Sequence, residues 1–356
     1  MLTASVFGGK MLHAQENKKP FFTELKVEAR ADAFYKSDLN KIGAEGKYLN
    51  IHWGGNLTEK FSYYFRQRLI AHPGNVKFFD NTDFLYINFQ ANKNWGIRAG
   101  KDALAIGGYE YDARPINVMY TSYYWTQYNC FQLAVTGTYT TNDGNHKFMA
   151  QVGKSPFSYT NSPYGEDGLF AYNLMWVGHI NHFNSMWSVN LFQRAKKQYM
   201  FHWALGNQLV YDKWDIYVDY INRTLGKDDF KNIFADYSLV GRASVKLGKS
   251  FNLFIKGGFE QNLSKYEITS SSHENGDLLV DNMALPDTRR YFYGGGLEYR
   301  PVSCPAFRIH AYVAEYNQTR VSTGEETSYL NANVGLTWEM DILNEINKQK
   351  NKKNRN

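Results

Sequence analysis

Three arginines in the first hundred residues have the spacing of an anion site. Arg66 and Arg68 are two positions apart, so in an extended strand their side chains point the same way, and Arg98 lies on the next strand but one. Guanidinium groups on one face can hold an anion through charge-assisted hydrogen bonds. The alternative is that these arginines pair with Glu28 or Asp32 and only solvate the surface on which they lie.

Residues that could catalyse a reaction or hold a metal ion are not grouped in this way. Among the nine histidines only His179 and His182 are close together, and they bracket a short turn without a cysteine or a nearby acid, which favours a polar turn over a metal site. Gly294-Gly295-Gly296 lacks the helix and the Lys-Ser/Thr of a phosphate loop, and it marks a bend or a close backbone contact. We expect no enzyme activity, catalytic residue, metal or cofactor.

The element that must position the arginines is a strand with one face in water. Apolar and charged residues alternate over residues 24–35, so that a strand gathers Glu24, Lys26, Glu28, Arg30 and Asp32 on one face. A helix would scatter these charges around its circumference. Five charges on one strand face need water behind them, which suits a channel wall and not a packed core. Residues 330–340 repeat the alternation at the other end of the chain.

Fourteen further candidate strands lie between these two segments. They are residues 43–54, 60–71, 83–91, 94–102, 129–141, 146–154, 169–180, 185–195, 199–212, 214–223, 234–247, 250–264, 290–300 and 306–318. Short Asn/Gly/Asp turns alternate with mostly longer connections, as in membrane barrels with short periplasmic turns and longer outer loops. Sixteen is an even number, as a bacterial barrel with both termini in the periplasm requires. The sequence therefore predicts a transmembrane antiparallel β-barrel of about sixteen strands.

Composition agrees with a membrane barrel. Aromatic residues make up 17% of the chain although its mean hydropathy is −0.52, and barrels use such residues where hydrocarbon meets water. No run of 18 apolar residues is present, which excludes a membrane helix. All eight prolines fall outside the candidate strands or at their margins, as expected where a lost ladder hydrogen bond cannot be replaced by lipid.

The strand pattern divides the chain into three parts. Residues 1–20 are a signal-peptide remnant or a disordered N-terminus, residues 21–341 form the barrel, and residues 342–356 form a basic periplasmic tail. The formal net charge is +6, and residues 348–355 hold five basic residues and no acid. The rest of the chain is nearly balanced, so no nucleic-acid partner is expected. We expect the tail to be solvated and disordered rather than bound to nucleic acid or anionic lipid.

Four short segments resemble the phosphate-selective porin O and P family. They are Gly46-Lys47-Tyr48, Phe61-Ser62-Tyr63-Tyr64-Phe65-Arg66, Asp83-Phe84-Leu85-Tyr86-Ile87 and Gly96-Ile97-Arg98-Ala99-Gly100-Lys101. The aromatic, Asn/Lys-rich style is similar to Bacteroidetes outer-membrane proteins. The resemblance implies a trimeric barrel of sixteen strands whose third loop folds into the lumen and narrows it. Residues 103–128 would be that constriction loop, with Glu110, Asp112 and Arg114 as its charged residues. The resemblance implies a series of cationic side chains along the constriction of phosphate-selective members. This loop differs, because it has more acidic than basic residues.

A count of the inward positions completes the prediction. The inward basic residues are Lys26, Arg30, Arg66, Arg68, Arg98, Lys147, Arg194, Arg242, Lys246, Lys256, Arg300 and Arg308. The inward acids are Glu24, Glu28, Asp32, Asp102, Asp215, Asp219, Glu260, Glu298 and Glu339. A selector for phosphate needs a potential of one sign along its path. Twelve basic residues against nine acidic ones is only a small positive excess. As residues of the solute path we select Lys26, Arg30, Arg66, Arg68, Arg98, Lys256, Arg300 and Arg308.

Two functional hypotheses follow. The first is an outer-membrane porin for passive diffusion of small polar or anionic solutes, phosphate being one candidate. The second is a structural barrel subunit of a larger outer-membrane complex without open-channel activity. The expected partners are outer-membrane lipid and the solutes, with either a homotrimer or other outer-membrane proteins. The expected location is the bacterial outer membrane, with both termini in the periplasm.

Overall fold

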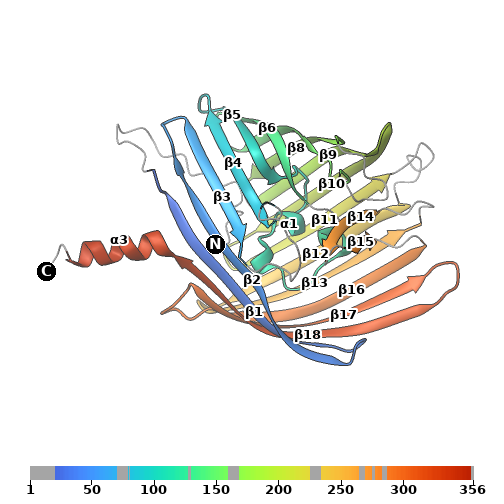
Figure 1. Cartoon of the computed structure of the whole chain (residues 1–356). Coiled ribbons are helices and arrows are strands. Elements are labelled where there is room, and N and C mark those ends of the chain that lie inside the picture. The colour runs from blue at the N-terminus through green and yellow to red at the C-terminus, as the bar shows by residue number, and fades with distance from the viewer. Residues whose placement is uncertain are drawn as a thin grey trace.

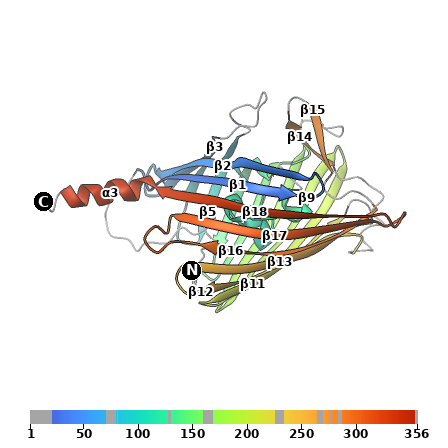
Figure 2. The same cartoon turned by 90° about the horizontal axis from the view of Figure 1, so that it is seen from below.

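The structure is a computed structural model that describes residues 21–69, 79, 81–126, 130–158, 168–224, 234–263, 269–274, 277–282 and 287–353. Sixteen antiparallel strands close into one barrel, in the order β1-β18-β17-β16-β13-β12-β11-β10-β9-β8-β7-β6-β5-β4-β3-β2 (Figures 1 and 2). The predicted fold and strand number are therefore confirmed. The expected signal-peptide remnant, residues 1–20, lies outside the described residues.

The strands follow the predicted segments closely. Their bounds are β1 Glu24–Lys36, β2 Lys41–Asn56, β3 Phe61–Arg68, β4 Thr82–Gln90, β5 Trp95–Ala103, β6 Phe131–Thr140, β7 His146–Lys154, β8 Phe170–Ile180, β9 Phe183–Ala195, β10 Gln198–Val210, β11 Trp214–Thr224, β12 Asp236–Leu247, β13 Phe251–Asn262, β16 Thr288–Tyr299, β17 Phe307–Arg320 and β18 Glu326–Asp341. The first and last strands pair over eleven residue positions, from Lys26 opposite Asp341 to Lys36 opposite Asn331, which closes the barrel without a free edge.

One hairpin differs from the sequence prediction. Strands β14 Thr269–Glu274 and β15 Asp277–Asn282 pair with each other in a separate sheet, within a segment expected to be a loop. Figure 2 shows them projecting from the rest of the barrel. The sequence of β14, Thr-Ser-Ser-Ser-His-Glu, has no apolar residue, so it lacks the alternation that marks a wall strand.

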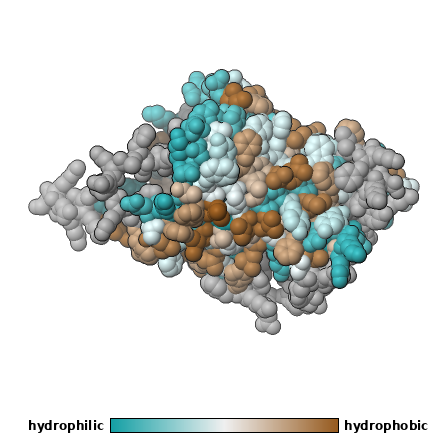
Figure 3. Space-filling view, turned by 90° about the horizontal axis from the view of Figure 1, so that it is seen from above, coloured by the Kyte–Doolittle hydropathy of each residue, from teal (hydrophilic) through white to brown (hydrophobic). Residues whose placement is uncertain are grey.

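The wall has an apolar outer face and a covered inner face. On β8 the outward side chain of Leu174 is 62% exposed, whereas its inward neighbour Asn173 is 2% exposed. The same contrast separates Leu133 and Val135 from Ala134 on β6. Figure 3 shows apolar side chains gathered on a face of this wall. A barrel in lipid needs this arrangement because hydrocarbon surrounds its outer face.

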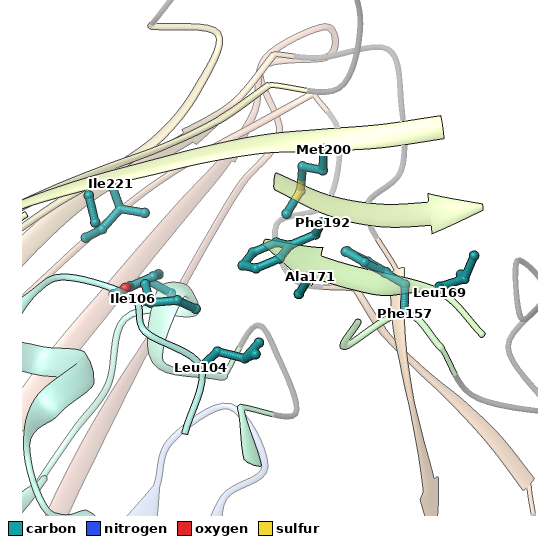
Figure 4. Packing of buried hydrophobic residues seen from close by; sticks show 10 residues of the cluster. Leu104, Ile106, Phe157, Leu169, Ala171, Phe192, Met200 and Ile221 are labelled. Carbon is teal, nitrogen blue, oxygen red and sulfur yellow. The ribbon is translucent and has the colours of Figure 1, made fainter. Parts of the chain in front are cut away.

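The buried core lies inside the barrel. Residues 104–126 contain the helix α1 Tyr109–Asp112, the 3₁₀ turn η1 Pro115–Asn117 and the helix α2 Tyr123–Thr126, and α1 lies within the ring of strands in Figure 1. Leu104 and Ile106 pack in one buried cluster with Phe192 and Met200 of the wall (Figure 4). A loop between β5 and β6 thus fills part of the lumen, as the family resemblance implied.

A further helix follows the barrel. Strand β18 leads directly into α3 Ile342–Lys353, which extends beyond the wall in Figure 1. The expectation of a disordered tail is therefore wrong for these residues. Helix formation is consistent with the residues Ile342-Leu343-Asn344-Glu345, which contain neither proline nor glycine, and with the ion pair between Lys348 and Glu345 one turn apart. None of the helices in the described part of the chain is long and apolar enough to span a membrane.

Candidate solute path and constriction loop

Two carboxylates of the wall hold the constriction loop through its backbone. Asp219 on β11 accepts hydrogen bonds from the N–H groups of Tyr109 (2.9 Å) and Glu110 (2.8 Å), and Glu260 on β13 accepts one from the N–H of Tyr123 (2.8 Å). These donors lie in the first turns of α1 and α2, where the backbone N–H groups have no partner within the helix. The loop is therefore fixed to the wall at two points by buried acids.

Glu110 is the centre of a third attachment. Its carboxylate forms an ion pair with Lys256 of β13 and accepts a hydrogen bond from the N–H of Ser122 (3.1 Å). The ammonium group of Lys256 also donates to the carbonyl of Tyr120 (2.6 Å). Lys256 is among the residues predicted for the solute path, but in the structure it is buried and holds the loop.

Arg30 and Arg308 also bind the loop. Arg30 donates to the carbonyl of Val118 (2.7 Å), and Arg308 donates to the carbonyl of Ile116 (2.7 Å). Each arginine forms an ion pair on the wall as well, Arg30 with Asp32 and Arg308 with Glu298. Both side chains point inward, as expected, but they are covered by the loop and anchor it there.

The remaining charged residues of the loop have different surroundings. Arg114 pairs with Glu28 on β1 and Glu339 on β18, so it joins the loop to the seam where the barrel closes. Asp112 is partly exposed at the end of α1. Burial raises the pKa of Asp112 to about 7, although Lys147 on the wall opposes this shift.

Arg66 and Arg68 share one carboxylate. Asp83 on β4 accepts from the Nε atoms of Arg66 (2.9 Å) and Arg68 (3.1 Å) and pairs with their terminal nitrogens at 2.8 Å. The partner is therefore Asp83 and not Glu28 or Asp32, the two acids that the sequence suggests. Strict alternation places Asp83 with Leu85 on the outer face, but the register between β3 and β4 shifts between Arg66 and Gln67. That irregularity could not be recognised in the sequence.

The other selected arginines and lysines also have acidic partners. Arg98 pairs with Asp102 (3.0 Å) and lies 4.2 Å from the ring centre of Tyr86. Towards the barrel end where β1 starts, Lys26 pairs with Glu24 (3.1 Å) and Arg300 lies 4.0 Å from Glu339. Their side chains remain partly exposed, so they can meet solutes at this end of the barrel.

The loop covers one side of the lumen more than the other. On β10 and β11 the inward side chains of His202 and Asp219 are fully covered, and on β13 Glu260 is almost so. On β3 and β4 the inward rings of Tyr64 and Tyr86 are partly exposed. At these positions the inner wall of β3 and β4 is therefore more accessible than that of β10, β11 and β13.

The comparisons with known proteins agree with this architecture. The chain is 10% identical to the anion-selective porin from Comamonas acidovorans (TM-score 0.58, covering 90% of this chain and 99% of that one). It is also 10% identical to the outer-membrane channel DcaP of Acinetobacter baumannii (TM-score 0.61, 89% and 96%) and to a trimer form of OmpT, an outer-membrane protein of Vibrio cholerae (TM-score 0.56, 90% and 100%). At this identity the similarity shows the fold. No curated protein matches the sequence.

The fold and the site define the class, a porin-type β-barrel of the bacterial outer membrane. Within that class, residues 24–177 match the model of the family "phosphate-selective porin O and P". This match runs from β1 into β8 and includes the constriction loop and all three arginines of the predicted anion site. It confirms the family resemblance over this part of the chain.

Proposed function

We propose that the chain forms a channel for passive diffusion of small polar solutes, with a preference for anions, along the wall of β3–β5. One observation carries the preference. The inward charges on these strands are Arg66, Arg68 and Arg98 against Asp83 and Asp102, an excess of one positive charge. The side chain of Arg68 is 42% exposed while that of Asp83 is 3% exposed, so the cation faces the water.

The excess favours anions without favouring phosphate in particular. Each of the three guanidinium groups has a carboxylate partner on the same wall. The potential along the path is therefore positive but moderate, which suits a preference among ions and not the tight capture of a multivalent one. Asp112 adds a negative charge to the loop when it is ionised, which reduces the preference further.

Uptake into liposomes tests the channel function. Purified full-length protein in phospholipid vesicles should admit small neutral sugars at rates that fall with solute size, because diffusion through water in a pore depends on size. Vesicles that contain the heat-denatured protein are the matched control. Equal swelling of the two preparations would contradict the proposal.

A structural subunit of a larger complex is the second candidate. The buried loop, attached to the wall by Asp219, Glu260 and Lys256, favours it because these contacts fill part of the lumen. Helix α3 also offers a surface outside the barrel. Affinity purification under mild detergent conditions separates the two candidates: a stoichiometric partner together with no solute uptake supports the second.

We also propose a trimer with both termini in the periplasm. Small outward residues line a shallow groove of about 680 Å³ that includes Ala33, Gly295, Ala311 and Ala332. Small residues allow close packing between membrane proteins. Native electrophoresis of Ala311→Trp, with the outward Leu174→Trp on β8 as control, tests the interface: loss of the trimer is expected only for Ala311→Trp. Labelling of Glu345→Cys in a Cys130→Ser/Cys304→Ser background tests the side of α3, and reagent access in intact cells would contradict the periplasmic location.

A further inference from the structure

A strip of aromatic rings lies on the inner wall between the arginines. Tyr64 on β3 is directly opposite Tyr86 on β4, and their ring centres are 5.6 Å apart. Phe84, two positions before Tyr86, lies 5.7 Å from Tyr64. The guanidinium of Arg66 lies 4.6 Å from the ring centre of Phe84, and that of Arg98 lies 4.2 Å from Tyr86. Cations thus border the rings at both ends of the strip.

The rings can be reached from the same space as the cations. Tyr64 and Tyr86 are partly exposed. Of the two arginines that pair with Asp83, Arg68 has the more exposed side chain. Successive inward positions on a strand are roughly 6.8 Å apart. This is about the length of a carboxylate joined to a six-membered ring. Arg66 is buried, but Arg98 lies beside Tyr86 and its side chain is 16% exposed, so one solute can touch Arg98 and Tyr86 together.

Gly100 keeps the strip in place. This residue on β5 pairs with Tyr86 and has a φ of +136°, a conformation that residues with a side chain rarely adopt. A Cβ atom at this position would lie 2.2 Å from the carbonyl oxygen of Leu85 and 2.7 Å from the Cα atom of Tyr86. Only glycine allows β5 to approach the backbone of Tyr86 so closely.

We propose, on the basis of the channel function above, that this wall prefers carboxylates attached to a flat ring. The planar guanidinium fork matches the two oxygens of a carboxylate. Aromatic rings next to it attract a flat apolar group, through offset or edge-to-face contacts. Phosphate gains from the arginines alone, and acetate carries no ring. The wall therefore separates anions by the group that carries the charge, and Tyr64 and Tyr86 are the specificity-determining residues.

Reversal potentials across planar bilayers test this preference. The full-length protein is measured with potassium benzoate, potassium acetate or potassium phosphate on one side and potassium chloride on the other. The permeability of benzoate relative to acetate should exceed the ratio of their mobilities in water by about threefold. The double variant Tyr64→Leu/Tyr86→Leu should lose this excess, whereas Tyr64→Phe/Tyr86→Phe, which keeps both rings, should retain it.

The outcomes distinguish this inference from the function on which it rests. Steady conductance with a benzoate-to-acetate ratio equal to the mobility ratio would overturn the inference and leave the channel function intact. A phosphate permeability above that of benzoate would likewise overturn it. Absence of any conductance would overturn both. The Phe variant shows whether a change in the Leu variant comes from the rings, since both variants remove the same hydroxyl groups.

Discussion

Glu110 in the constriction loop and Lys256 on β13 form a buried ion pair between residues 146 positions apart in the chain. The pair joins the loop to the wall opposite the accessible strands β3–β5. We therefore expect this pair to help determine how much of the lumen the loop leaves open.

Replacing Lys256 by Met should free the loop. The change leaves the buried Glu110 without its cation, which destabilises the folded loop by about 3 kcal/mol. We expect a larger or noisier single-channel conductance and faster amide hydrogen exchange in residues 107–124. Lys246→Met on β12 is the matched control, because the side chain of Lys246 donates to the carbonyl of Asp212 near the end of the barrel, away from the loop. Identical conductance of the two variants would show that the ion pair does not position the loop.

Substitution of Asp83 and substitution of its partners Arg66 and Arg68 should change ion selectivity in opposite directions. Arg66→Ala/Arg68→Ala removes two positive charges and should lower the permeability of chloride relative to potassium. Asp83→Asn removes one negative charge and should raise it, because selectivity follows the sign of the local potential. Reversal potentials in a salt gradient measure both effects, with the exposed Arg320→Ala as control. An unchanged reversal potential in the double variant would remove these arginines from the solute path.

The ion preference should depend on pH through Asp112. Because burial raises its pKa to about 7, this carboxyl group is mostly neutral below that pH and negative above it. Anion preference should therefore be higher at about pH 5.5 than at about pH 8.5, on either side of that pKa. Asp112→Asn should reduce the difference. A pH dependence of the same size in the wild type and in Asp112→Asn would mean that other groups cause it.

The same pKa predicts a trend in stability. Folding raises the pKa of Asp112 from its ordinary value of 3.8 to about 7, so the folded chain holds this proton more tightly than the unfolded chain. Its contribution to stability is present in full below the lower value and is lost as the pH rises through the higher one. Denaturant titrations should therefore show that the wild type loses stability, relative to Asp112→Asn, as the pH rises from 3.8 to about 7.

A charge on the outer face of the wall tests whether that face contacts lipid. Leu174→Arg places a cation towards hydrocarbon in the middle of β8, which should destabilise the barrel by about 2–4 kcal/mol. Asn142→Arg in the exposed turn between β6 and β7 should have almost no effect. Urea titrations in lipid vesicles provide the comparison. Equal losses of stability would contradict the proposed orientation of β8.

The strands were predictable because lipid and water impose opposite requirements on successive residues. The alternation from Glu24 to Asp32 is readable within one segment, and it places these charges inward as the structure does. The hairpin β14–β15 forms a sheet separate from the barrel wall, and its first strand shows no alternation of apolar and polar residues. Its serine-rich first strand therefore could not be distinguished from a loop.

The roles of the inward residues were less predictable than their direction. Arg30, Lys256 and Arg308 point inward, but they bind the loop rather than line open space. Their partners lie 86 to 192 positions away in the chain, so no local pattern connects them. Asp83 was missed for a different reason, since a register shift of one residue reverses the side on which a residue lies.

Single-channel recording tests the channel function most directly. We predict that the purified, folded protein inserts into planar bilayers and produces steady conductance steps that grow with salt concentration, because the wall of β3–β5 remains accessible beside the loop. Folding of the same sample is checked by its heat-dependent shift in gel electrophoresis. Folded protein that inserts without any conductance steps would contradict the channel function and support the structural subunit instead.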